Sequence, residues 1–153
     1  MATVTVDKCI DQLNSLLRGE ISSVETYEQA IRKVDDEHAS DATALRAIAQ
    51  EHGEAAQALR DEIRRLGGEA DDSSGPWGAW AKVVEGTAKL FGDASAVKAL
   101  KEGEEHGLKD YREGIDDVDE PARQLIRTKL IPAQIRHIGV LDAMIAKINA
   151  IGD

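Results

Sequence analysis

The stretch LLRGEISSVETYEQAI at residues 16–31 returns in altered form as LKEGEEHGLKDYREGI at residues 100–115. In both copies a glutamate stands seven residues before a tyrosine, which is two helical turns, so the two side chains share one helix face. Apolar residues at helical spacing lie on the same face and mark it as the buried one. A carboxylate there requires a partner. The repeated pairs are Glu20 with Tyr27, and Glu104 with Tyr111.

The composition predicts an all-α protein. The chain has 153 residues, which is enough for one domain with a substantial core, so we expect residues 1–153 to form a single domain. Apolar residues make up 42% of the chain but aromatic residues only 3%, a balance that favours helices over a β-sandwich. With only three prolines, long uninterrupted helices are possible.

The charge balance excludes some classes of partner. The formal net charge of −10 argues against nucleic acid and against an anionic membrane surface, because both require a basic face. The single cysteine, Cys9, cannot form an internal disulfide, which is typical of a reducing compartment. Neither a secretory signal nor an apolar run of membrane-spanning length is visible. These observations predict a cytoplasmic protein.

Four segments carry apolar residues at three- and four-residue spacing, which predicts four amphipathic helices. The first can be capped by Asp7, the second by Ser40 or Asp41, and Pro121 suits the first turn of the fourth. The pair at residues 67–68, both glycine, predicts the end of the second helix. Pro132 lies inside the fourth pattern and should kink or restart that helix. The expected helices span residues 7–36, 40–66, 94–116 and 120–148.

The lengths of the connections predict two antiparallel hairpins joined by a long crossover at residues 67–93. Trp77, Trp80 and Phe91 suggest a short extra helix within it. This segment can be a lid over one end of the bundle. It can equally be an interface, with Trp77 and Trp80 as contact residues, because tryptophan is enriched at interfaces. We expect a homo-oligomer that forms through the Trp77–Phe91 segment.

Each helical stripe is apolar until its middle, where a polar residue interrupts it. Buried polar groups at one depth on four helices can partner one another. In a bundle core this is also the geometry of a metal site, with a carboxylate on two helices and a Glu-x-x-His pair on the other two. The interrupting residues are Glu20, His52, Glu104, Gln134 and His137.

These residues resemble the pattern of the ferritin-like superfamily, in particular rubrerythrins and bacterioferritins. The two Glu-x6-Tyr phrases match its first and third helices, and Gln134-x-x-His137 takes the place of a Glu-x-x-His pair. The crossover resembles that of an uncharacterised bacterial branch of the superfamily. The resemblance implies a ferritin-like four-helix bundle with a long crossover and a degenerate di-metal site.

The resemblance also implies a ligand set. Glu20 and Glu104 would be carboxylate ligands, His52 and His137 nitrogen ligands, and Gln134 a weak ligand or a neighbour of the site. A full di-iron site has more carboxylates, so this set fits one divalent ion, Fe²⁺, Mn²⁺ or Zn²⁺, better than bridged di-iron chemistry with O₂. Tyr27, Tyr111 and Glu51 are expected beside the ligands.

Two alternatives remain open from the sequence. A different register of the second helix turns Glu51 and Glu54 inward instead of His52 and Ala55, at the cost of the apolar run around them. The polar layer can also be a metal-free hydrogen-bonded network. The function is accordingly either metal binding with a stress or metal-handling role, or non-catalytic action of the bundle through oligomerisation or partner binding. Whether the protein is an enzyme stays open.

Overall fold

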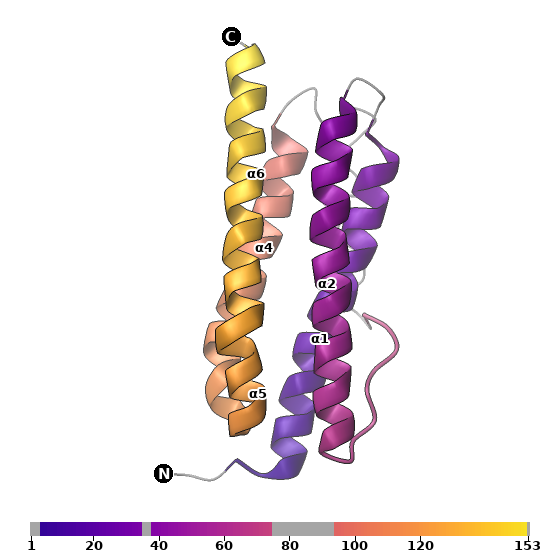
Figure 1. Cartoon of the computed structure of the whole chain (residues 1–153), viewed down its shortest axis with the longest axis vertical. Coiled ribbons are helices and arrows are strands. Elements are labelled where there is room, and N and C mark those ends of the chain that lie inside the picture. The colour runs from indigo at the N-terminus through magenta and orange to yellow at the C-terminus, as the bar shows by residue number, and fades with distance from the viewer. Residues whose placement is uncertain (1–3, 35–37, 75–93, 153) are drawn as a thin grey trace.

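The computed structural model describes residues 4–34, 38–74 and 94–152 (Figure 1). These residues are helical or lie in connections, and they contain no strand. The expectation of an all-α fold is therefore confirmed for the described part of the chain. The helices are α1 (Val6–Arg32), α2 (Ala39–Arg65), α4 (Ser95–Gly114), the 3₁₀ turn η3 (Ile115–Asp117), α5 (Glu120–Leu125), the π-helical turn η4 (Ile126–Leu130) and α6 (Ile131–Gly152).

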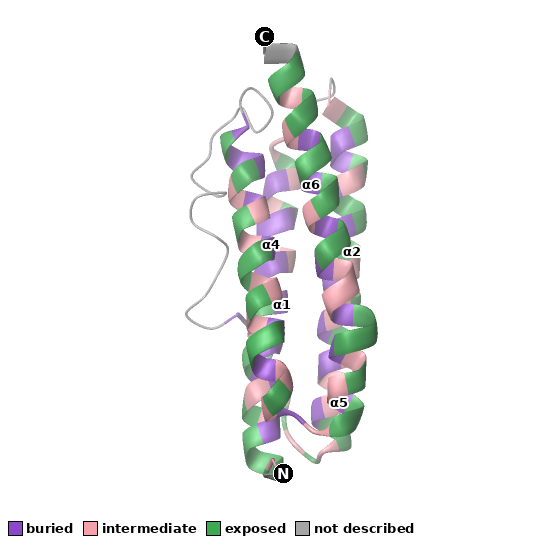
Figure 2. Cartoon of the chain, turned by 90° about the vertical axis from the view of Figure 1, so that its left-hand side faces the viewer, coloured by how far each residue is buried: buried purple, intermediate pink, exposed green. Residues whose placement is uncertain are grey.

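The described helices form a bundle of two hairpins. α1 packs along α2, and α4 packs along α6, whereas contacts between the two pairs are fewer (Figure 1). The segments α5, η4 and α6 follow one another along a single column. Along each long helix, buried residues alternate with exposed ones at helical spacing, so each helix has a buried face and an exposed face (Figure 2). None of the described helices has the length and apolar character that crossing a membrane requires.

The helix ends differ in part from those expected. The cap of α1 is Thr5, whose hydroxyl accepts a hydrogen bond from the amide of Lys8 at 3.2 Å, and Asp7 lies inside the first turn. α1 ends at Arg32 rather than at residue 36, because the next amide, of Lys33, already bonds three residues back to Ala30. The predicted stop of α2 is confirmed by the φ of +82° at Gly67, which glycine adopts without strain.

The fourth column is interrupted next to Pro132, as expected, but by a π-helical turn. Pro121 lies in the first turn of α5, and the Asp119 carboxylate caps that helix by accepting from the amide of Ala122 at 3.3 Å. The π turn η4 then spans the five residues Ile126–Leu130 immediately before α6. Because proline has no amide proton and its ring crowds the preceding turn, a wider turn relieves the conflict without breaking the column.

The core has two apolar clusters with a polar layer between them along the bundle. Leu13, Leu59 and Ile126 are fully buried members of the first cluster. Leu45, Leu100 and Leu141 are fully buried members of the second. The layer between them consists of side chains that are nine-tenths or more buried, namely Glu20, His52, Glu104, Gln134 and His137.

Hydrogen bonds and an ion pair hold the start of the crossover against α1. The Asn14 amide donates to the carbonyl of Glu69 and accepts from the amide of Asp71, each at 2.9 Å. Arg18 pairs with the Asp71 carboxylate at 2.5 Å, and the Ser74 hydroxyl donates to Glu25 at 3.0 Å. Trp77, Trp80 and the expected extra helix lie outside the described residues, so their role as an interface stays a prediction.

Asn14→Asp tests this fastening with almost no change of shape. A carboxylate cannot donate to the Glu69 carbonyl and would repel it, so we expect the free energy of unfolding to fall by about 1–3 kcal/mol. Ser15→Asp, which adds the same charge at the next, exposed position, should change it by less than about 0.5 kcal/mol. Urea unfolding followed by circular dichroism measures both. Equal effects of the two substitutions would contradict the contact.

Candidate metal centre

His52 on α2 lies between the two repeated glutamates. Its Nδ1 is 2.5 Å from Oε2 of Glu20 on α1, and its Nε2 is 2.6 Å from Oε1 of Glu104 on α4. With a carboxylate against each ring nitrogen, both nitrogens donate, which makes the ring an imidazolium. The preferred register of α2, with His52 inward, agrees with this burial, since Glu51 is half-buried and Glu54 exposed.

Each tyrosine of the repeat donates a hydrogen bond to the glutamate of the other copy. Tyr27 on α1 donates to Oε1 of Glu104 on α4 at 2.7 Å. Tyr111 on α4 donates to Oε1 of Glu20 on α1. Burial, followed by the nearby carboxylate charges, raises the pKa of each tyrosine well above its usual value, so both remain neutral donors. Each copy of the repeated phrase therefore completes the hydrogen bonding of the other.

His137 on α6 joins the layer through Glu104. Its Nδ1 is 3.3 Å from Oε2 of Glu104, and its Nε2 is 3.2 Å from Oε1 of Glu51 on α2. The rings of His137 and His52 are 4.7 Å apart. Glu51 is also bonded to Arg136 at 2.8 Å. The sequence did not indicate Arg136, because its only mark is its position beside His137 and its partner is on another helix.

The opposite charges of His52 and the two glutamates shift the pKa values of His52 and Glu104. Burial alone would lower the pKa of His52, but the charges of Glu20 and Glu104 and their hydrogen bonds outweigh it and raise the pKa to about 10. Burial alone would raise the pKa of Glu104, but the charge of His52 and the hydrogen bonds from both histidines lower it to about 2. At neutral pH His52 is thus an imidazolium and Glu104 an ionised carboxylate.

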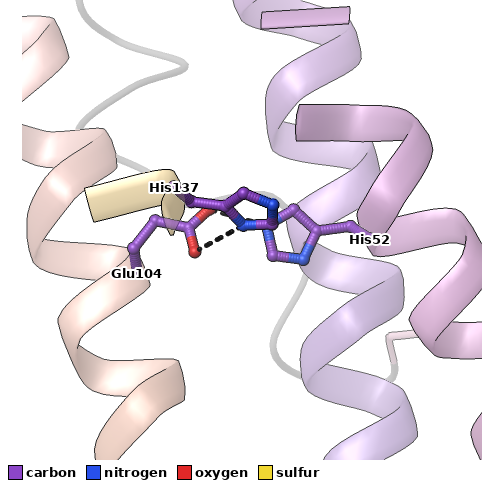
Figure 3. A group of neighbouring side chains, drawn as sticks. All are labelled: His52, Glu104 and His137. Atoms are coloured by element: carbon purple, nitrogen blue, oxygen red, sulfur yellow. Dashed lines mark hydrogen bonds and ion pairs between the residues drawn. The ribbon is translucent and has the colours of Figure 1, made fainter. Parts of the chain in front are cut away.

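Three of these residues can hold one metal ion. His52, Glu104 and His137 each offer a ligand atom, and these atoms lie within 4.8 Å of one another (Figure 3). Ligands at 2.0–2.1 Å from a tetrahedral ion are about 3.3 Å apart, so the His52–Glu104 contact of 2.6 Å would have to open by less than 1 Å. Two imidazoles and one carboxylate are a donor set that suits Zn²⁺ and Fe²⁺.

Both histidines of this group have a carboxylate behind them. Glu20 accepts from Nδ1 of His52, and Glu51 faces Nε2 of His137, so one nitrogen of each ring is left toward Glu104. Carboxylates in this position fix the tautomer and orientation of ligating histidines in metal sites. Burial alone would raise the pKa of Glu51, but its bond to Arg136 and the charge of His137 lower it. The arrangement occurs twice around one potential metal position.

Glu20, expected as a ligand, and Gln134, expected as a weak ligand or a neighbour of the site, lie elsewhere in the layer. Glu20 is outside the three-residue group and contacts it through the far nitrogen of His52. Gln134 is buried beside the group, and its amide donates to the backbone carbonyl of Glu104 at 3.0 Å. Gly107 allows this approach, because a Cβ at that position would collide with the Gln134 amide.

The fold and the layer define the class of protein, a helical bundle with a buried histidine–glutamate centre. Residues 8–117, well over half of the chain, match the family described as a domain of unknown function, DUF2383, and the chain belongs to that family. The match includes Glu20, His52 and Glu104 but ends before Gln134 and His137. No curated protein and no solved structure matches the chain.

The layer predicts a characteristic pH dependence of stability for the metal-free protein. The pKa of His52 is raised on folding from 6.5 to about 10, so its contribution is complete below pH 6.5 and is lost as the pH rises toward 10. The pKa of Glu104 is lowered from 4.5 to about 2, so its contribution is complete above pH 4.5 and is lost in more acid solution. Stability should therefore be greatest between these limits.

Urea unfolding with a chelator present, at intervals from pH 3 to pH 9.5, measures this dependence. We expect the alkaline decline to approach about 1.4 kcal/mol per pH unit at its steepest. In His52→Gln the alkaline decline should disappear. A wild type whose stability does not fall between pH 7 and pH 9.5 would contradict the charged state of His52.

Glu20→Ala tests the contact between Glu20 and His52. It leaves Nδ1 of His52 and the hydroxyl of Tyr111 without an acceptor, so we expect a loss of about 2–4 kcal/mol in the free energy of unfolding. Glu28→Ala, on the exposed side of the same helix, is the matched control and should change it by less than about 0.5 kcal/mol. If the two substitutions have equal effects, Glu20 does not hold His52.

Proposed function

We propose that this protein is a ferritin-like metal-binding protein that holds one divalent ion in the core of its bundle. His52 through Nε2, Glu104 through its carboxylate and His137 through Nδ1 would be the ligands. Fe²⁺, Mn²⁺ and Zn²⁺ are the candidate ions. The carrying observation is that these three buried side chains, from three different helices, present ligand atoms within 4.8 Å of one another.

The surroundings of the group support the same proposal. Glu20 and Glu51 stand behind the two histidines, where carboxylates hold ligating imidazoles in one tautomer. The charges of Glu20 and Glu104 match that of a divalent ion once the proton on His52 Nε2 has left. A bound ion would supply a Lewis-acidic centre with an open coordination position. Tyr27 would keep the Glu104 carboxylate oriented by its hydrogen bond.

The ferritin-like assignment rests on the arrangement of the hairpins. Two hairpins with related sequences, a long crossover between them and a polar layer at mid-height are features of that superfamily. The layer here has fewer carboxylates than a di-iron site requires, so we propose metal handling or a stress-associated role rather than ferroxidase chemistry. Assembly into a homo-oligomer through the crossover is part of the same proposal.

The direct contacts between the side chains of the layer favour a second function. His52 is in direct contact with both glutamates, and every member of the layer has a hydrogen-bond partner without an ion. Such a network can fix the register of the four helices by itself. In that case the bundle would act through association, and its polar layer would be structural.

Metal titration separates the two functions. Protein freed of metal with a chelator is titrated with Zn²⁺ or Co²⁺ at pH 7.5 by calorimetry, with the Co²⁺ absorption spectrum as an independent readout of coordination. We expect about one equivalent to bind in the wild type. His137→Gln should abolish binding, and Glu51→Gln should weaken it by about 10–100-fold because the orientation of His137 is lost.

The control for this titration is His38→Gln, at the start of α2 and outside the three-residue group, which should bind as the wild type does. Binding of less than a tenth of an equivalent by the wild type would contradict the metal-binding function and favour the structural network. Equal affinities of His38→Gln and His137→Gln would place any bound ion outside the buried three-residue group.

A further inference from the structure

A cavity of about 420 Å³ is lined by residues of α1 and α4. These two helices are in contact in the bundle. Its inner wall includes Glu20, Tyr111 and Gln134, all of which are at least nine-tenths buried. Gln134 is bonded to the backbone of Glu104, and Tyr111 is bonded to Glu20, which holds His52. The cavity therefore reaches the polar layer from outside the bundle.

Small residues create this space. Glycines and serines from both helices line it, so the two backbones are separated by little side-chain volume. A Cβ added at Gly19 would meet no atom within 4 Å, which shows how open the cavity is at that point. The small lining residues are Ser15, Gly19, Ser22 and Ser23 on α1, and Gly103, Gly107 and Gly114 on α4.

The charge of the lining favours a cation. The described residues around the cavity include four carboxylates and no lysine or arginine; they are Glu20, Asp110, Glu113 and Asp117. Asp110 pairs with His106, which also lines the cavity, at 3.4 Å. Asp117 and Glu113 have lysine partners, at 3.3 Å and 3.8 Å, but these lysines are exposed and lie outside the lining. A cleft in which carboxylates outnumber cationic groups raises the local concentration of cations.

A second cavity of about 440 Å³ lies on the opposite side, between α2 and the fourth column, and is lined by Glu51 beside the layer. Its lining holds Glu51 and Glu54 but also Lys129 and Arg136, so the formal charges cancel. Arg136 is moreover bonded to Glu51, the carboxylate nearest to the centre on that side. A cation gains less on approaching from this side than through the space between α1 and α4.

We propose that the α1–α4 cavity is the route by which a divalent cation reaches and leaves the centre. This proposal rests on the proposed metal-binding function. The acidic rim attracts the ion, and Glu20 and Gln134 form the inner end of the route. Gln134 lies between the cavity and Glu104, against Gly107. A movement of its side chain would therefore open the path from the cavity to Glu104.

Filling the cavity tests the route. Gly19→Leu places a side chain in the open space without a backbone clash, and Gly139→Leu is the matched control. Gly139, on α6, is exposed, has equal room for a Cβ and lines neither cavity. Stopped-flow absorbance measures Co²⁺ loading, and transfer of Co²⁺ to excess chelator measures release.

In Gly19→Leu we expect loading and release to slow together, each by about tenfold or more, with an unchanged dissociation constant. A blocked route raises the barrier in both directions and leaves the bound state as it was. Gly139→Leu should keep the wild-type rates. Equal rates in the two variants would overturn the proposal. So would a change of sedimentation coefficient in Gly19→Leu alone, because the cavity would then be a contact between copies.

Ionic strength gives an independent readout. The loading rate of the wild type should fall as salt is raised, and the double variant Asp110→Asn, Glu113→Gln should load more slowly at low salt and depend less on salt. A double variant with the wild-type salt dependence would overturn the role of the acidic rim. If the wild type binds no Co²⁺ at equilibrium, the metal-binding function itself fails, which the titration shows separately from the rates.

Discussion

The imidazolium of His52, held at 2.5 Å and 2.6 Å between two buried carboxylates, is the interaction on which the centre of this bundle depends. A buried ionised carboxylate is unstable in an apolar core unless a positive charge and hydrogen bonds compensate it. One ring supplies both to Glu20 and to Glu104. It thereby ties α1, α2 and α4 together at one depth, and His137 adds the column of α6.

Under the proposed function, the position between His52 and Glu104 would hold either a proton or a metal ion. With a proton on each nitrogen, His52 satisfies both glutamates directly. With a metal ion in place of the inner proton, Glu20 would keep its bond to Nδ1 while Nε2 and Glu104 would become ligands. Competition between protons and metal ions for histidine and carboxylate ligands is general. Glu20 and Glu51 would hold their histidines in either state.

Much of this arrangement could be predicted from the sequence, because it follows from periodicity. The apolar stripes placed Glu20, His52, Glu104 and His137 inward, and Gly67 predicted the end of α2. The partners of these residues could not be predicted, since they depend on the offset between helices and on rotamers. Glu20 was thus expected to be a ligand but lies behind His52. Neither Thr5 as the cap of α1 nor the π turn before Pro132 was predicted. Both depend on local hydrogen bonds that many different sequences can form, so the sequence does not specify them.

The crossed tyrosine pairs have a consequence for how the chain folds. Tyr27 belongs to the first hairpin and Glu104 to the second, while Tyr111 and Glu20 have the reverse relation. Each hairpin alone keeps a histidine against its glutamate, but it cannot supply the acceptor of its own tyrosine hydroxyl or the hydroxyl that its glutamate accepts from. A partially folded state with one intact hairpin lacks both cross-hairpin bonds, so it is disfavoured relative to the complete bundle. The duplicated phrase thus makes the two halves of the chain a single cooperative unit.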